Sequence, residues 1–177
     1  MDLKTEYVTL PVDDGTSMRG YVAHPAAPPS RGVIVCQEAF GVNPHIRDVT
    51  ERFARQGFLS IAPELYHRTA PGFEGRYDDF PSVMAHMKAL TDAGMAADLR
   101  AAYSWLTKNG GRGDFPVAAV GFCMGGRAAI LTALTVPVAC AVFVLWRRHC
   151  PYREQSRPSE SHRRVDPPAS TFLGRER

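Results

Sequence analysis

The sequence predicts an α/β protein with one mostly parallel sheet and helices on its faces. Over the first 145 residues, short apolar runs typical of buried strands alternate with segments of helical periodicity. The apolar runs are continuous rather than alternating with polar residues, which is typical of strands buried on both faces of a parallel sheet. The chain has 177 residues, of which 45% are hydrophobic and 22% charged, enough for one domain with a buried core.

In the first half of the chain, turn residues and periodicity locate the expected elements. Residues 18–23 have the pattern of a strand, and residues 7–10 are expected to pair with it across a turn at residues 13–15. A helix is expected to start at Pro44 and to stop at Gly57. The other expected elements are strands at 32–36 and 58–62 on either side of a helix at 44–56, then a long loop at 63–80.

The second half continues the alternation of strands and helices. Residues 82–108 are expected to form one or two helices, with a break near Gly94. Cys36 and Cys140 lie in apolar, strand-like runs, so both are expected to be small core residues. The remaining elements are a strand at 117–122, a helix at 124–135 and a strand at 138–145.

The composition changes after Leu145. Residues 147–177 contain eight arginines, no lysine and four prolines, and they show no strand or helix period. We therefore expect a partial α/β domain at 1–145 and an aberrant Arg/Pro-rich tail at 146–177. The tail is either disordered or the product of a frameshift or truncation that replaced the true C-terminal third. The second explanation is favoured because a parallel sheet should not end on an exposed apolar strand.

The charge and the cysteine pattern exclude several classes of protein. The tail carries a net charge of +4, which leaves −1 for the rest of a chain whose total is +3, so nucleic-acid binding by the folded part is not expected. No apolar run approaches the roughly 20 residues of a membrane helix, and residues 1–6 show no signal-peptide pattern. A cytoplasmic protein without a membrane partner is expected. The four cysteines lack CxxC spacing, so neither a zinc site nor a disulfide framework is indicated. No metal or organic cofactor is expected.

The most informative motif is Gly121-Phe122-Cys123-Met124-Gly125-Gly126. It lies between the expected strand at 117–122 and the helix at 124–135. A buried strand, a sharp turn with small residues around one nucleophile, and then a helix form the layout of a nucleophile elbow. A thiol at a helix N-terminus is favoured as the thiolate, and the free N–H groups there can stabilise an oxyanion.

Together with three further motifs, this run resembles the dienelactone hydrolase family, a Cys-nucleophile branch of the α/β-hydrolase fold. The resemblance covers about residues 3–145 and implies an α/β-hydrolase fold truncated on its C-terminal side. It also implies hydrolysis of an unsaturated lactone or related carboxylic ester, in bacterial breakdown of aromatic compounds, with no cofactor. The three further motifs are Gln37-Glu38-Ala39-Phe40-Gly41-Val42-Asn43, Pro63-Glu64-Leu65-Tyr66 and Ala70-Pro71-Gly72.

The resemblance assigns roles to individual residues. It implies that Cys123 is the nucleophile and that Glu38, near the resting thiol, takes part in forming the thiolate. It places the oxyanion hole at the backbone N–H groups of Ala39 and Met124. The family's substrates carry a carboxylate, so an arginine is expected in the pocket, and Arg76 in the 63–80 loop is the candidate. Two other arginines are considered by location, Arg47 and Arg127.

Two alternatives to an active hydrolase remain open. The family triad also needs an Asp and a His from later strands, and His149, His162 and Asp166 of the tail match no family motif. The chain is therefore either a hydrolase by descent or an inactive fragment or non-catalytic binding module. Nucleotide binding is weaker, because Arg127 and Ala128 follow the glycine-rich turn where a phosphate-binding loop needs Lys and Ser or Thr.

Overall fold

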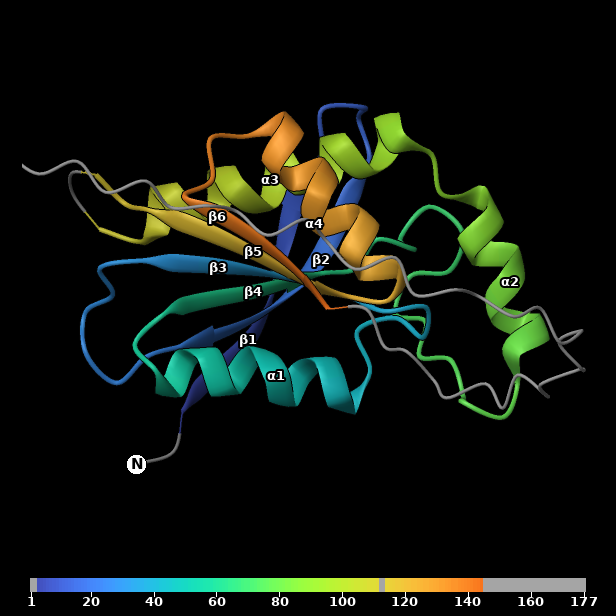
Figure 1. Cartoon of the computed structure of the whole chain (residues 1–177), viewed down its shortest axis with the longest axis horizontal. Helices are drawn as coiled ribbons and strands as arrows, with labels where there is room; N and C mark the ends of the chain where they lie inside the picture. The colour runs from blue at the N-terminus through green and yellow to red at the C-terminus, as the bar shows by residue number, and fades with distance from the viewer. Residues whose placement is uncertain (1–2, 112–113, 145–177) are drawn as a thin grey trace, which may run out of the picture. The chain divides into compact units, whose positions relative to one another are not determined.

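The computed structural model describes residues 3–111 and 114–144. The predicted tail at 146–177, with His149, His162 and Asp166, lies outside these residues. The elements, labelled in Figure 1, are β1 (Lys4–Pro11), β2 (Ser17–His24), β3 (Gly32–Cys36), α1 (Pro44–Arg55), β4 (Leu59–Pro63), α2 (Phe80–Ala89), α3 (Asp92–Asn109), β5 (Val117–Phe122), α4 (Met124–Thr135) and β6 (Cys140–Val144).

The described strands form one sheet in the order β1-β2-β4-β3-β5-β6. Strands β4, β3, β5 and β6 are parallel to one another, whereas β2 pairs antiparallel with both β1 and β4. The β1–β2 turn is closed by Asp14, whose Oδ1 accepts hydrogen bonds from the Thr16 N–H at 3.0 Å and the Thr16 hydroxyl at 2.6 Å. The mostly parallel sheet of an α/β protein, with an N-terminal hairpin, is confirmed.

Helices cover both faces of the sheet, as Figure 1 shows. Helix α1 packs on one face through Ile46 and Val49, against Val33 and Val35 of β3. Helices α3 and α4 cover the other face, where the larger apolar cluster lies. All residues of β3 and β4 are buried, as a strand between two helical layers requires. None of the helices formed by the described residues has the length and hydropathy needed to cross a bilayer.

Capping side chains set the helix boundaries. Helix α1 begins after Asn43, whose Oδ1 accepts a hydrogen bond from the Ile46 N–H at 3.1 Å. Helix α3 begins after Thr91, whose hydroxyl accepts from the Gly94 N–H at 3.1 Å. Gly94 therefore lies in the first turn of α3. The prediction of a break near Gly94 is confirmed, because α2 ends at Ala89 and α3 begins at Asp92, so the break includes the capping threonine three residues before the glycine.

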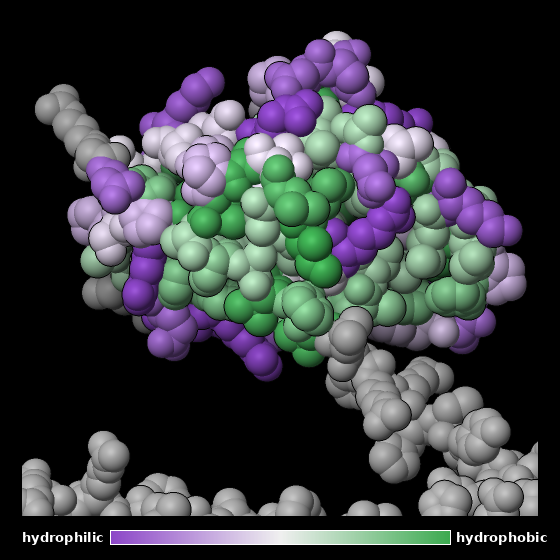
Figure 2. All heavy atoms as spheres, turned by 45° about the horizontal axis from the view of Figure 1, so that its top comes forward, coloured by the Kyte–Doolittle hydropathy of each residue, from purple (hydrophilic) through white to green (hydrophobic). Residues whose placement is uncertain are grey.

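Strand β6 is an edge strand of the described sheet. Val142 and Phe143 are 51% and 52% exposed, and with exposed apolar residues of α4 they form an apolar surface (Figure 2). Cys140 at the start of β6 is exposed as well, whereas Cys36 in the central strand β3 is fully buried. The prediction of a core residue is confirmed for Cys36 and wrong for Cys140, because β6 lies at the edge and not inside the sheet.

Candidate active site

The chain turns sharply between β5 and α4, and Cys123 lies at the turn. Its φ of 54° and ψ of −115° are rare for a residue with a Cβ, and no other non-glycine residue in the described ranges has a positive φ. Its N–H donates to the carbonyl oxygen of Val144 at 3.1 Å, and its own carbonyl accepts from the Gly126 N–H at 3.0 Å. The side chain is exposed and makes no capping hydrogen bond, so the thiol faces solvent at a helix N-terminus.

Two glycines make this turn possible. A Cβ at Gly121 would collide with the carbonyl oxygen of Gly125. A Cβ at Gly125 would collide with the carbonyl oxygen of Gln37 and would lie 2.6 Å from that of Cys36. The turn after β5 therefore packs directly on the backbone at the end of β3. Both positions require glycine because of this close backbone approach.

The pairing of β3 with β5 brings Glu38 and Cys123 to the same edge of the sheet. The two strands are parallel neighbours, with Cys36 opposite Gly121. Glu38 and Cys123 each come two residues after these partners, where the two strands end. Ligands of open α/β sheets bind in the crevice at the carboxyl ends of the strands. The two residues that the sequence selects are thus placed at adjacent strand ends.

The Glu38 side chain is half-buried and is bonded to a tyrosine of the β4–α2 loop. The Tyr77 hydroxyl donates to Glu38 Oε1 at 2.7 Å, and Asn43 Nδ2 donates to the Tyr77 oxygen at 3.2 Å. Burial raises the pKa of Tyr77, and its hydrogen bond to the Glu38 carboxylate raises this pKa further. Within the described ranges no hydrogen bond joins Glu38 to Cys123. Glu38 Oε2 accepts no hydrogen bond from the described residues either.

The backbone N–H groups of Ala39 and Met124 donate to no other group among the residues that the structure describes. Met124 is the first residue of α4, where an N–H has no intrahelical acceptor. Ala39 is buried in a turn that is closed by the Gly41 N–H, which donates to the Glu38 carbonyl oxygen at 3.3 Å. Each of the two predicted oxyanion donors is therefore an unused N–H, next in sequence to Cys123 or Glu38.

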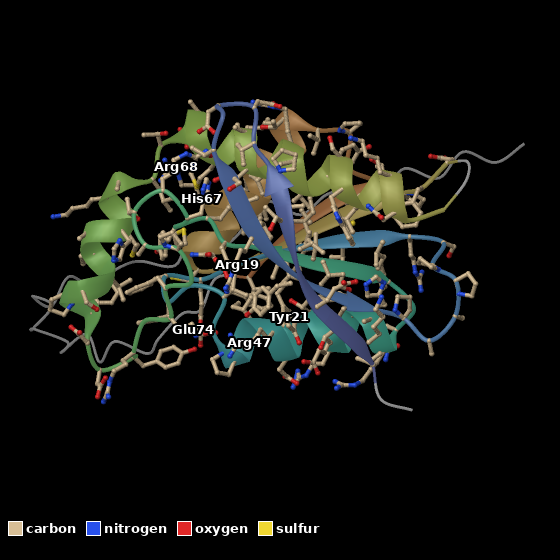
Figure 3. All side chains as sticks on the ribbon, turned by 180° about the vertical axis from the view of Figure 1, so that it is seen from behind. Arg19, Tyr21, Arg47, His67, Arg68 and Glu74 are labelled. Atoms are coloured by element: carbon tan, nitrogen blue, oxygen red, sulfur yellow. The ribbon has the colours of Figure 1, made fainter. Side chains whose placement is uncertain are left out.

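The loop between β4 and α2, predicted as a long loop, is tied to β2 and to α1 by two carboxylates, of which Glu74 is labelled in Figure 3. Glu64 accepts hydrogen bonds from Arg19 Nε at 3.0 Å and Nη2 at 2.6 Å. Glu74 forms an ion pair with Arg47 of α1 and an isolated β-bridge with Gly41. The second half of the loop consequently lies alongside the turn after β3, on the Glu38 side of the site.

Each arginine considered for substrate binding is paired with an acidic residue. Arg76 lies in the β4–α2 loop and bonds Asp78 at 2.7 Å, with 78% of its side chain exposed. The structure shows no contact of Arg76 with Cys123 or Glu38, so its role in binding substrate stays a prediction. The other two pairs are Arg47 with Glu74 and Arg127 with Asp92.

Tyr66 is a residue of this region to which sequence reasoning gave no role. Its hydroxyl donates to the carbonyl oxygen of Ala39 at 2.9 Å, and the residue is buried. Burial and, to a smaller extent, the negative charge of a Cys123 thiolate raise the pKa of Tyr66 to about 12. An aromatic residue just after a buried strand was visible in the sequence. Its partner was not, because Ala39 lies 27 residues earlier.

A buried ionic cluster, also absent from the sequence predictions, joins the segment after β4 to α3 (Figure 3). His67 Nε2 lies 3.0 Å from Asp98 Oδ1, and Arg68 donates to both oxygens of Asp98 at 2.8 and 2.9 Å. Arg68 also bonds Asp14 in the β1–β2 turn. The cluster anchors the chain after β4 to α3, and no hydrogen bond among the described residues joins His67 to Cys123. The described residues contain no His, Cys, Asp or Glu cluster suited to a metal ion.

Known proteins resemble this chain in sequence. The sequence model of the Dienelactone hydrolase family matches residues 18–176. A "putative carboxymethylenebutenolidase" from Synechocystis sp. is 41% identical over 138 residues, which are 75% of this chain and 55% of the relative. A protein of the same name from Salmonella typhi is 40% identical over 135 residues, which are 73% of this chain and 48% of the relative. The chain thus spans about half the length of the curated relatives it matches.

Solved structures resemble this chain as well. A "putative dienelactone hydrolase" from Klebsiella pneumoniae superposes with a TM-score of 0.66 at 34% identity, covering 77% of this chain and 57% of that one. A dienelactone hydrolase-like promiscuous phosphotriesterase from metagenomic libraries gives a TM-score of 0.64 at 25% identity, covering 82% and 59%. The family model and the solved structures agree with the sheet and with the glycine-bounded cysteine turn: the chain belongs to the dienelactone hydrolase family and has the α/β-hydrolase fold.

Proposed function

We propose that this chain carries the nucleophile half of a site that hydrolyses carboxylic esters or lactones, with Cys123 as the nucleophile. One observation carries the proposal: Cys123 is held at positive φ, exposed, at the start of α4 and beside the strand end that carries Glu38. The names of the relatives, carboxymethylenebutenolidases and dienelactone hydrolases, support a small lactone or ester as the substrate. A cytoplasmic location remains part of the proposal.

The reaction begins when the Cys123 thiolate attacks the carbonyl carbon of the substrate. A C–S bond forms and the carbonyl π electrons move to the oxygen, where the N–H groups of Ala39 and Met124 donate to the developing charge. The C=O bond then re-forms and the alcohol oxygen leaves, taking up the proton that was removed from the thiol; in a lactone this step opens the ring. The product of this step is a thioester on Cys123. Water attacks the thioester, its hydroxyl completes the carboxylic acid, and its proton returns to the sulfur.

Glu38 is the proposed acceptor of the thiol proton. Its carboxylate is at the strand end next to the Cys123 turn. Tyr77 occupies Oε1, so Oε2 is the oxygen available for the proton. Transfer of this proton leaves the sulfur as thiolate, the form that attacks a carbonyl.

For the second half of the reaction, the residues that the structure describes offer no base at the Cys123 turn. The family resemblance requires a His and an Asp from later strands, and no described residue fills these roles at the Cys123 turn. We therefore propose that an activated ester acylates Cys123 faster than water releases the acyl group. Arg76 remains the proposed contact for a substrate carboxylate, because it lies in the loop on the Glu38 side.

Reaction with p-nitrophenyl acetate tests this proposal. We expect a burst of about one equivalent of nitrophenolate and a single acetyl group on Cys123, found by intact-mass and peptide analysis. The variant Cys123→Ala should show no burst. Cys140→Ala is the matched control, since Cys140 is also exposed but lies at the start of β6, and its burst should equal that of the parent chain.

Other outcomes of this experiment contradict the proposal. A burst that persists in Cys123→Ala, or equal acetylation of Cys140, would show that the turn does not activate Cys123. Absence of any acylation would favour the alternative function, an inactive fragment or binding module. That alternative is supported by one observation, that the chain spans about half the length of its relatives.

A further inference from the structure

We infer that Tyr66 is a positioning residue of the proposed oxyanion site, and that its hydroxyl fixes the turn that carries the Ala39 N–H. The inference rests on the proposed function of Cys123 and extends it to a residue outside the expected nucleophile, proton acceptor and oxyanion donors. It depends on three features: the hydrogen bonds of the turn after β3, the packing of the Tyr66 ring, and the protonation state of the hydroxyl.

The turn after β3 is held at three consecutive carbonyl groups. Peptide units are planar, so fixing the Glu38 carbonyl also fixes the direction of the Ala39 N–H in the same unit. Fixing the Ala39 carbonyl restricts the next unit, and with it the rotations on either side of the Ala39 Cα. The three hydrogen bonds are Gly41 N–H to Glu38 O at 3.3 Å, Tyr66 O–H to Ala39 O at 2.9 Å, and Gly75 N–H to Phe40 O at 2.9 Å.

Of these three donors, Tyr66 is the one that belongs to a side chain. It lies three residues after the end of β4, so it couples the turn to a second strand end. The Leu65 N–H, next to it, donates to Gln37 Oε1 at 3.0 Å. The segments 37–39 and 65–66 are therefore joined by two hydrogen bonds, both donated by residues 65–66.

The Tyr66 ring has little freedom to move its hydroxyl away from Ala39. Tyr66 is 2% exposed. Its ring lies 5.8 Å from the Phe73 ring in an edge-on arrangement and 5.7 Å from the His86 ring. The hydrogen bond to Ala39 is thus made by a donor whose side chain is already ordered, and such preorganised groups position reacting partners at low entropic cost.

Tyr66 also remains a hydrogen-bond donor at neutral and moderately alkaline pH. Its pKa is raised to about 12, first by burial and then by the charge of a nearby Cys123 thiolate. A phenol loses its proton only as the pH rises through its pKa, so the O–H is intact at neutral and moderately alkaline pH.

Two reactions of Cys123 separate a role in the oxyanion site from a role in the fold. Acylation by p-nitrophenyl acetate passes through an oxyanion, whereas alkylation by iodoacetamide does not. Tyr66→Phe keeps the ring and removes the hydroxyl. We expect it to lower the acylation rate about tenfold, less than the loss of an entire oxyanion donor, and to leave the alkylation rate unchanged. The control is Tyr103→Phe, whose hydroxyl also donates to a backbone carbonyl, that of Pro137, at 3.5 Å.

Each other outcome has a definite meaning. If Tyr66→Phe and the parent chain are acylated at the same rate, the inference is overturned and the proposed function stands. If both reactions slow equally, the hydroxyl supports the thiol or the fold instead of the oxyanion site, which also overturns the inference. If the parent chain is not acylated at Cys123, the proposed function fails and the inference fails with it. Thermal melting of both tyrosine variants shows that the folds are comparable.

Discussion

The turn after β5 and the turn after β3 lie at the same edge of the sheet, yet they are held in different ways. The β5 turn depends on its own residues: Gly121 and Gly125 leave room for Cys123 to adopt a positive φ. The β3 turn depends on residues far along the chain, since Tyr66 bonds Ala39 and Tyr77 bonds Glu38. One side of the proposed site is set by local sequence and the other by long-range contacts.

This difference has a consequence for how substitutions should act. On the β5 side a single added methyl group meets backbone atoms that cannot move aside, so large local effects are expected. On the β3 side several contacts share the task, and the loss of one leaves the others in place. Substitutions on the β3 side should therefore lower the free energy of unfolding less, and should act more on the reactivity and the pKa values of the site. Four predictions follow this order, from the largest effect to the smallest.

Gly125→Ala should have the largest effect on stability. The new Cβ would collide with the Gln37 carbonyl and lie 2.6 Å from the Cys36 carbonyl, so the β5 turn must separate from β3. We expect a loss of about 3 kcal/mol or more in the free energy of unfolding, measured by urea denaturation. Gly126→Ala is the control in the same helix, because its Cβ would meet only the Phe143 Cβ at 3.3 Å, and it should change the free energy by about 1 kcal/mol or less. Equal losses would contradict the account of the turn.

Asp98→Asn should be the next largest change, because it breaks the cluster that anchors the segment carrying Tyr66. Asp98 is fully buried and accepts from His67 and Arg68, so the change leaves buried donors without their charged partner. We expect a loss of about 2 kcal/mol in the free energy of unfolding. The control is Asp14→Asn, which alters the exposed end of Arg68 and should shift the transition much less. A full-sized effect of Asp14→Asn would show that the anchor lies at the surface.

The same distinction explains what could be predicted from the sequence. The strands, α1 and the Cys123 turn depend on apolar periodicity, capping residues and glycines, all of which are local. The exposure of Cys140 could not be predicted, because it depends on the place of β6 in the sheet. The partners of Tyr66 and Tyr77 were missed for a related reason: they come from strand ends and loops distant in sequence. The position of Glu38 just after a buried strand could be predicted from the sequence, but its hydrogen bond from Tyr77 could not.

Glu38→Gln tests the long-range contact on the β3 side. The Glu38 carboxylate accepts a hydrogen bond from the Tyr77 hydroxyl, so it favours the neutral phenol. This adds to the rise in the pKa of Tyr77 that burial causes. Removing the negative charge should lower this pKa toward 10, the ordinary value, in a 13C NMR titration of the tyrosine rings. Glu74→Gln is the control, a carboxylate of the same loop that pairs with Arg47 and should leave Tyr77 unchanged. An unchanged Tyr77 pKa in Glu38→Gln would mean that the contact is not kept in solution.

Arg76→Ala should have the smallest effect on stability and separates structure from substrate binding. The pair of Arg76 with Asp78 is exposed and local, so the melting temperature should not change. If Arg76 meets a substrate carboxylate, acylation of Cys123 should slow about threefold for a p-nitrophenyl ester with a free carboxylate, and not for p-nitrophenyl acetate. Arg52→Ala, which removes another exposed arginine paired with an acidic residue, should affect neither ester. If Arg76→Ala slows neither ester relative to the parent chain, recognition of the carboxylate belongs to other residues. The β4–α2 loop then has a purely structural task, that of holding the turn that carries Glu38.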